Sequence, residues 1–114
     1  MKKLTSAVLA ASLLGAAPVR AAPPTPLTGN DLFGDCMANT DTAEYLACVA
    51  FVSGFRNAVD VFGRNSVCIP PTVVNFQVVD LLKIELARAP TVRHNPVADL
   101  VGSILMGAWP CPQK

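Results

Sequence analysis

The sequence has few of the side chains on which catalysis and metal binding usually depend. It contains one histidine, His94, and it has neither a C-x-x-C pair nor an H-E-x-x-H segment. A glycine-rich phosphate-binding loop is also missing from the sequence. These absences argue against a zinc site, a thioredoxin-like redox centre and a nucleotide-binding enzyme. The sequence therefore predicts a protein that is not an enzyme and needs no cofactor or metal ion.

Charged residues are also scarce, at 15% of the chain, and the nine basic residues nearly balance the eight acidic ones. Lys2, Lys3 and Arg20 lie in the predicted leader described next, so its removal leaves six basic residues against eight acidic ones. A mildly acidic chain has no basic surface for nucleic acid and no polybasic patch for anionic lipid. We therefore expect no nucleic-acid partner, and no membrane contact after the leader is removed.

The first 21 residues have the pattern of a secretory signal peptide. Lys2 and Lys3 precede an apolar or small run over residues 4–17, and small residues follow at Val19 and Ala21. The run is shorter than the roughly 20 apolar residues that span a bilayer. We predict a signal peptide over residues 1–21, an extended linker over 22–27 and a single domain over 28–114. The predicted location is the periplasm.

Four cysteines remain in the mature chain: Cys36, Cys48, Cys68 and Cys111. An even number of cysteines in an exported protein predicts disulfides. Four cysteines allow three pairings, and the spacing alone does not choose among them. The predicted positions of the helices favour Cys36–Cys48 and Cys68–Cys111.

Apolar residues recur at helical spacing in four segments, 28–38, 41–63, 72–89 and 96–109. Thr28 or Asn30 is expected to cap the first helix, Asp41 with Glu44 to begin the second, and Asn95 to cap the fourth. The predicted fold is therefore all-α: a small four-helix orthogonal or irregular bundle held by two disulfides.

Each of the three longer helices has a predicted buried face. In the second helix these residues are Cys48, Phe51, Val52, Phe55, Val59 and Phe62. In the third they are Val74, Val78, Leu81, Leu82 and Leu86, with Val79 at the edge. In the fourth they are Val97, Leu100, Val101, Ile104 and Ala108, and two glycines there, Gly102 and Gly107, are expected to permit close packing.

Three further patterns have both a structural and a functional interpretation. Phe76 and Ile84 fall on the charged side of the third helix, either as scattered surface residues or as a contact with a partner or a second copy. Asp31 and Asp35 lie four residues apart, as a carboxylate pair or as ordinary charge near a helix start. A strip of small residues in the second helix would let another backbone come close: Ala43, Ala47, Ala50 and Gly54.

An ordered set of motifs resembles the Rap/Tai family of periplasmic immunity proteins of type VI secretion. The set consists of Cys48-Val-Ala-Phe-Val-Ser-Gly54, Cys68-Ile-Pro70, Pro90-x-x-Arg93, Pro96-x-x-x-Leu100-Val101 and Trp109-Pro110-Cys111. The sequence departs from the family pattern at Phe51-Val52 and at Val97. The resemblance implies a small α-helical protein that binds and inhibits a peptidoglycan amidase toxin by covering its active site.

If the resemblance holds, the partner-binding residues should be exposed and partly charged. We expect Arg88, Arg93 and His94 around the loop between the third and fourth helices, with Phe76 and Ile84 as a toxin contact or a self-association (homodimer) patch. The main alternative is a periplasmic acid-stress chaperone similar to HdeA, which is also small, helical and disulfide-bonded. A scaffold subunit of an envelope complex is a third interpretation.

Overall fold

The protein is described by a computed structural model that covers Gly15, residues 25–63 and residues 65–113. Most of the predicted signal peptide, and residues 22–24 of the predicted linker, lie outside these residues. The described chain forms four helices: α1 (Gly29–Met37), α2 (Ala43–Phe62), α3 (Asn75–Arg88) and α4 (Val97–Ala108). The described residues contain two isolated β-bridges, Thr28 with Pro96 and Val67 with Pro110, and no strand. The predicted all-α bundle is confirmed.

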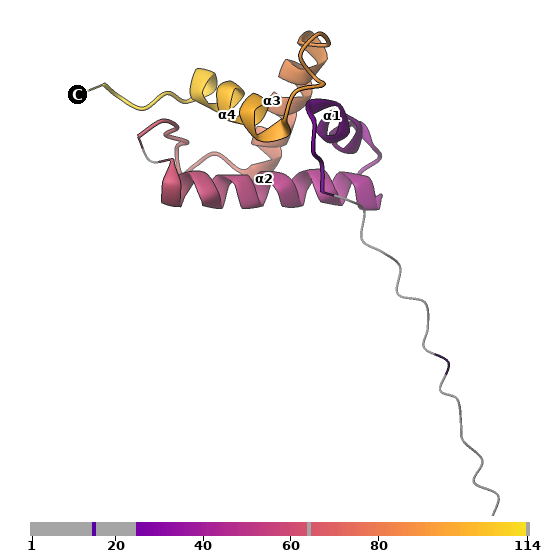
Figure 1. The fold of residues 1–114 in the computed structure, drawn as a ribbon. Helices are drawn as coiled ribbons and strands as arrows, with labels where there is room; N and C mark the ends of the chain where they lie inside the picture. The colour runs from indigo at the N-terminus through magenta and orange to yellow at the C-terminus, as the bar shows by residue number, and fades with distance from the viewer. Residues whose placement is uncertain (1–14, 16–24, 64, 114) are drawn as a thin grey trace, which may run out of the picture.

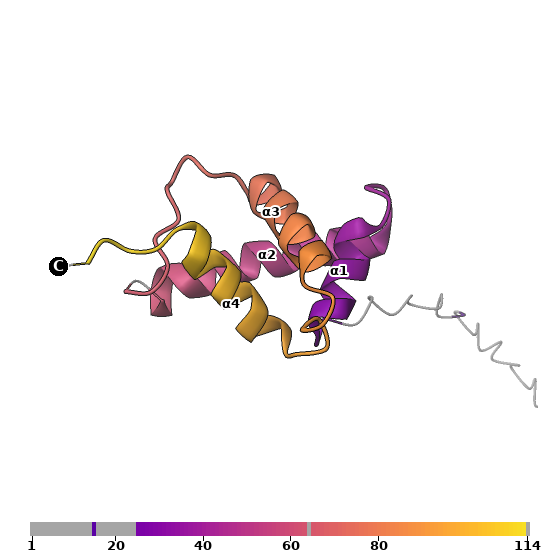
Figure 2. The same ribbon diagram turned by 90° about the horizontal axis from the view of Figure 1, so that it is seen from above.

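Helix α2 runs along one side of the molecule, and α1, α3 and α4 all lie on its other side (Figure 1). Seen from above, α3 and α4 cross over α2 at steep angles, with α1 beside the start of α2 (Figure 2). Helices α1, α2 and α3 pack against one another, and α4 packs on α1 and α3. The outer face of α2 is therefore not covered by another helix of the described chain.

The predicted stripe of α2 faces the core for most of its length. Cys48 and Val52 are fully buried, and the three residues Phe51, Phe55 and Val59 pack against the core while partly buried. Phe62, which we predicted to be buried, is 89% exposed. The prediction fails because α2 ends at Phe62, where Gly63 caps it and the chain turns away.

Helix α3 begins three residues later than predicted, because the β-branched pair before it stays extended. Val74 is the N-cap residue in an extended conformation, and it is 59% exposed where we predicted burial. Val73 is buried in its place, and Val79, placed at the edge of the face, is buried too. Val78, Leu82 and Leu86 are buried as predicted, and Leu81 is partly buried.

Helix α4 lies close to its predicted bounds, but its buried residues differ in part from the prediction. Its N-cap residue is Pro96, without a side-chain cap, so the prediction that Asn95 caps the helix is wrong. Val97 and Val101 are buried as predicted, but Leu105 is buried and Ala108 is exposed. Ala108 is the last residue of α4, and it lines the groove between α3 and α4.

Both predicted disulfides are present. Cys36 and Cys48 join the last turn of α1 to the second turn of α2, with their Cα atoms 5.1 Å apart. Cys68 and Cys111 join the segment after α2 to the chain after α4, with a Cα–Cα distance of 4.8 Å. Beside the second bridge, the Cys68 N–H donates to the Trp109 carbonyl at 2.9 Å. The first bridge links α1 to α2. The second links the segment before α3 to the segment after α4.

The start of α1 is held by a capping box. Asp31 Oδ2 accepts hydrogen bonds from the N–H of Thr28 (2.9 Å), the Thr28 hydroxyl (2.9 Å) and the N–H of Leu27 (3.2 Å). These bonds favour the carboxylate and lower the pKa of Asp31. One turn later, burial raises the pKa of Asp35, and the charges of Asp31 and Glu44 raise it further. Ionised Asp31 therefore stabilises the folded protein, whereas ionised Asp35 destabilises it.

The opposite shifts predict opposite effects of two isosteric substitutions. Asp31→Asn should lower the melting temperature at neutral pH, because its folded-state pKa is depressed and its stabilisation is lost only as pH falls below the ordinary value of 3.8. Asp35→Asn should raise the melting temperature, because its folded-state pKa is raised and ionisation opposes folding. That gain should shrink as pH falls through the raised pKa. Thermal unfolding followed by circular dichroism at neutral and acidic pH measures both, and shifts of the same sign at neutral pH would contradict this assignment.

Candidate partner-binding surface

The segment between α3 and α4, residues 89–96, forms a compact turn that we call the 89–96 loop. The Val92 N–H donates to the Ala89 carbonyl at 3.3 Å, and the Asn95 N–H donates to the Val92 carbonyl at 3.0 Å. These bonds fix the backbone, while the tip faces solvent. The exposed tip residues are Pro90, Thr91, Val92 and His94.

The loop is fastened to the start of α1. The Gly29 N–H donates to the Asn95 carbonyl at 3.1 Å, and the Asn30 N–H donates to the Arg93 carbonyl at 2.7 Å. The Val97 N–H donates to the Leu27 carbonyl at 3.0 Å. A Cβ at position 29 would lie 2.9 Å from the Arg93 carbonyl oxygen, so glycine is needed there for the close approach. The first helix thus supplies free N–H groups that hold the loop in one shape.

Arg93 contributes to the same attachment and is not a fully exposed residue. Its guanidinium carbon lies 4.4 Å from the centroid of the Phe33 ring, within range of a cation–π interaction. Its side chain is half-buried, and its Nε is buried without a hydrogen-bond partner among the described residues. Arg93 therefore joins the loop to α1, and through this contact it sets how the neighbouring His94 is presented.

His94 and Arg88 are exposed, as we expected for partner contacts. Arg88 Nη1 lies 3.2 Å from Glu85 Oε1, and 72% of the Arg88 side chain is exposed. Such a surface ion pair adds little stability, so the guanidinium is free to exchange this partner for another carboxylate.

Phe76 and Ile84 lie on the same exposed side of α3 as Arg88. Positions 76, 84 and 88 are separated by multiples of four residues, which places them in one row along the helix. Phe76 is 59% exposed and Ile84 is 50% exposed. The structure therefore brings three of the five expected residues into a row that ends at the 89–96 loop, while Arg93 faces α1.

A groove between α3 and α4 was not foreseen from the sequence. Its volume is about 520 Å³. Leu81, Leu100 and Ile104, which pack against the core while partly buried, form its sides. Gly107, expected to permit close packing, has open space where a Cβ would be, and it lines this groove instead. Because Ala89 and Val92 of the loop also line it, the groove opens beside the loop tip.

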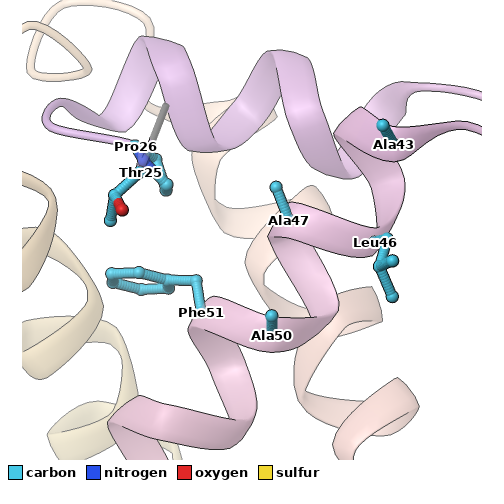
Figure 3. A pocket seen from close by; sticks show the side chains of 7 residues that line it. All are labelled: Thr25, Pro26, Ala43, Leu46, Ala47, Ala50 and Phe51. Carbon is cyan, nitrogen blue, oxygen red and sulfur yellow. The ribbon is translucent and has the colours of Figure 1, made fainter. Parts of the chain in front are cut away.

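A second groove lies on α2, over the strip of small residues. It has a volume of about 390 Å³ and is lined by residues of the first two turns of α2 together with Thr25 and Pro26 (Figure 3). Pro26, which we expected in an extended linker, is buried against this part of the molecule. No other helix covers the strip, so the expected close approach of a backbone does not occur within the described chain.

The surface has features suited to the recognition of another protein. No group of three or more metal-ligating side chains occurs among the described residues. All four cysteines are in disulfides, so none is available as a nucleophile. The surface offers a rigid loop, a row on α3 formed by Phe76, Ile84 and Arg88, and an apolar groove. These features suit the binding of another protein by shape and charge.

The chain matches the family described as Rap1a immunity proteins over residues 28–111. The match covers all four helices and both disulfides. This protein therefore belongs to the class of small disulfide-linked helical immunity proteins, and within that class to the Rap1a immunity family. No curated protein and no solved structure matched the chain.

Proposed function

We propose that this protein neutralises a peptidoglycan amidase toxin, delivered by a type VI secretion system, by occluding the active-site cleft of the amidase. The family match carries the immunity function, since immunity proteins act by binding a toxin. The amidase as target and the periplasm as location rest on the sequence resemblance, on the predicted signal peptide and on disulfides typical of exported proteins.

The 89–96 loop is the part of the molecule best suited to enter a cleft. Its backbone is fixed by hydrogen bonds to Gly29 and Asn30, so little conformational entropy is lost on binding. Its tip presents His94 and the partly exposed Val92, and Arg88 lies at the base with a weakly held charge. We assign Phe76 and Ile84 to the flank of the same contact, along the row on α3.

Two substitutions distinguish a residue that contacts the toxin from one that holds the 89–96 loop in place. His94→Ala should weaken toxin binding about tenfold, the loss expected for a contact residue, and should leave the melting temperature unchanged because His94 is exposed. Arg93→Ala should weaken binding and also lower the melting temperature, because the contact with Phe33 is lost. Calorimetric titration against the purified amidase measures the affinity.

Asn65→Ala serves as the control, because Asn65 is exposed in the segment that follows α2. Its affinity should equal that of the unmodified protein. If His94→Ala and Arg93→Ala also bind with unchanged affinity, the 89–96 loop is not the toxin contact.

The acid-stress chaperone remains an alternative that the family match does not favour. It requires exposure of apolar surface to client proteins near pH 2–3, driven by protonation of carboxylates. A light-scattering assay with an acid-denatured client at that pH tests it. Suppression of aggregation would support the chaperone, and no suppression would leave the immunity function as the sole candidate of the two.

A further inference from the structure

The groove between α3 and α4 is lined mostly by apolar side chains, with a single carboxylate in its α3 wall. Leu81, Glu85 and Ala89 follow one another at intervals of four residues along that wall. At 1.5 Å per residue, Glu85 lies about 6 Å from each end of this row, near the middle of the groove. Its side chain is 37% exposed, so part of it is covered by the surrounding wall.

Both polar side chains of the groove present hydrogen-bond acceptors. The ionised carboxylate of Glu85 accepts hydrogen bonds and donates none. The Ser103 hydroxyl donates its proton to the Asp99 carbonyl at 2.8 Å, which leaves the lone pairs of Ser103 Oγ for a ligand. The backbone N–H groups of Ala89 and Val92, at the loop end of the groove, already donate to carbonyls. A ligand in the groove therefore has to supply its own donors.

The charges around the groove favour a positively charged ligand. Helices α3 and α4 run in opposite directions (Figure 2), and each ends at the groove, since Ala89 is the C-cap of α3 and Ala108 is the last residue of α4. The last carbonyls of a helix carry partial negative charge, which attracts a cation. Asp99 adds a carboxylate in the first turn of α4. The groove therefore suits a ligand with an apolar body and a cationic head.

Arg88 is the basic residue beside the groove, and its pairing with Glu85 is weak. Its Nη1 lies 3.2 Å from Glu85 Oε1, and 72% of its side chain is exposed. Because an exposed ion pair contributes little to stability, a cation held in the groove displaces Arg88 from Glu85 at little cost. The guanidinium of Arg88 then becomes available to a carboxylate outside the groove.

We propose that the groove binds a segment of the toxin in which an apolar side chain lies next to a lysine or an arginine. The apolar side chain packs against Leu100 and Ile104, which line the α4 wall. The aliphatic stem of the basic residue lies along the apolar wall, and its ammonium or guanidinium donates to Glu85 and to Ser103 Oγ. This inference rests on the proposed function, because it takes the toxin bound by the 89–96 loop as the partner.

The groove continues into the 89–96 loop, which places both in one interface. Ala89 and Val92 belong to the loop and also line the groove. When the loop enters the active-site cleft of the amidase, the rim of that cleft lies over the groove. The basic segment that the groove binds is therefore expected at the cleft rim.

This arrangement makes Glu85 a residue that determines specificity. A toxin with a basic residue at the cleft rim pairs with Glu85 and frees Arg88 for a second contact. A toxin with an apolar residue there covers the carboxylate without a partner, and an acidic residue repels it, so both bind more weakly. The 89–96 loop blocks the cleft, whereas the groove selects which amidase is bound.

Calorimetric titration of the purified amidase at low and high salt tests the role of the charge. Glu85→Gln should weaken binding by about tenfold or more at low salt, because the cation of the toxin loses its partner. The affinity of this variant should also fall less steeply as salt is raised, since one charge pair is missing. Glu44→Gln removes the same charge from an exposed position at the start of α2, and it should bind as the unmodified protein does.

Filling the groove tests its role without removing a charge. Gly107 has open space where a Cβ would be, so Gly107→Leu places a side chain in the groove and replaces a helical glycine by a better helix former. This variant should weaken toxin binding by about tenfold or more and should not lower the melting temperature. Gly34→Leu makes the same change at an exposed position of α1 with equally open space, and it should leave the affinity unchanged.

The same titrations separate failure of this inference from failure of the proposed function. If the unmodified protein binds the amidase and Glu85→Gln and Gly107→Leu bind equally well, the groove is not part of the interface, although the immunity function stands. A loss of affinity in Gly107→Leu alone would overturn the basic character of the bound segment. If the unmodified protein does not bind the amidase, both the inference and the proposed function are overturned.

Discussion

Replacing Cys68 and Cys111 together by serine should lower the free energy of unfolding by about 4 kcal/mol. The bridge closes a loop with a sequence separation of 43, and in the chain-entropy model a loop of that length contributes about 4 kcal/mol. Cys68 is exposed and Cys111 is half-buried, so the substitution leaves little cavity and mainly frees the unfolded chain. Urea denaturation followed by circular dichroism measures the loss.

The loss should also be local. The segment between α2 and α3 depends on this bridge, on the Cys68–Trp109 hydrogen bond and on the burial of Val67. Hydrogen exchange should therefore rise in residues 65–74 and at the end of α4, while α1 stays protected by Cys36–Cys48. A loss of less than about 1 kcal/mol, with exchange unchanged, would show that the noncovalent contacts alone hold the C-terminal half.

Replacing Gly29 by alanine should destabilise the protein by about 2 kcal/mol and weaken toxin binding as well. The added Cβ would lie 2.9 Å from the Arg93 carbonyl oxygen and 3.2 Å from the Arg93 Cα. Leu100 also meets the Cβ and is able to rotate away, but the backbone at Arg93 is held by the Asn30 N–H. The loop must shift, and overpacking of this kind costs about 1–3 kcal/mol.

Gly34→Ala is the matched control within the same helix. A Cβ at position 34 meets nothing within 4 Å, so this change should raise stability by up to about 1 kcal/mol through helix propensity. Urea denaturation and calorimetric titration with the amidase measure both variants. Equal stability and equal affinity of the two variants would show that the close approach of α1 and the 89–96 loop contributes neither to stability nor to toxin binding.

The helices and the disulfides were predictable because local patterns determine them. Apolar spacing predicted α1 and α2 to within two residues at each end, and Thr28, one of the two predicted candidates, caps α1. The N-cap residue of α2 is Thr42, one position after the predicted Asp41. The helix positions then brought each cysteine close to its partner. The errors fell at element ends. Val74 and Phe62 are exposed because the chain is extended before α3 and turns after α2, and both depend on tertiary packing.

The candidate surface was only partly predictable for the same reason. Exposure of Phe76, Ile84 and Arg88 follows from spacing on a single helix. The position of Arg93 against Phe33 depends on a contact between segments 60 residues apart in the sequence. The α3–α4 groove depends on how far two helices diverge. Neither has a local sequence signal. Gly107, which we expected to permit close packing, lines the groove instead.

We propose that this protein acts on a toxin by covering it. The most direct test is a peptidoglycan-hydrolysis assay with a purified type VI amidase of the same organism, the proposed partner, titrated with the oxidised mature protein. We predict complete inhibition at one immunity protein per amidase, with the reduced protein inhibiting less. Full amidase activity in the presence of a stoichiometric excess of the oxidised protein would contradict the claim.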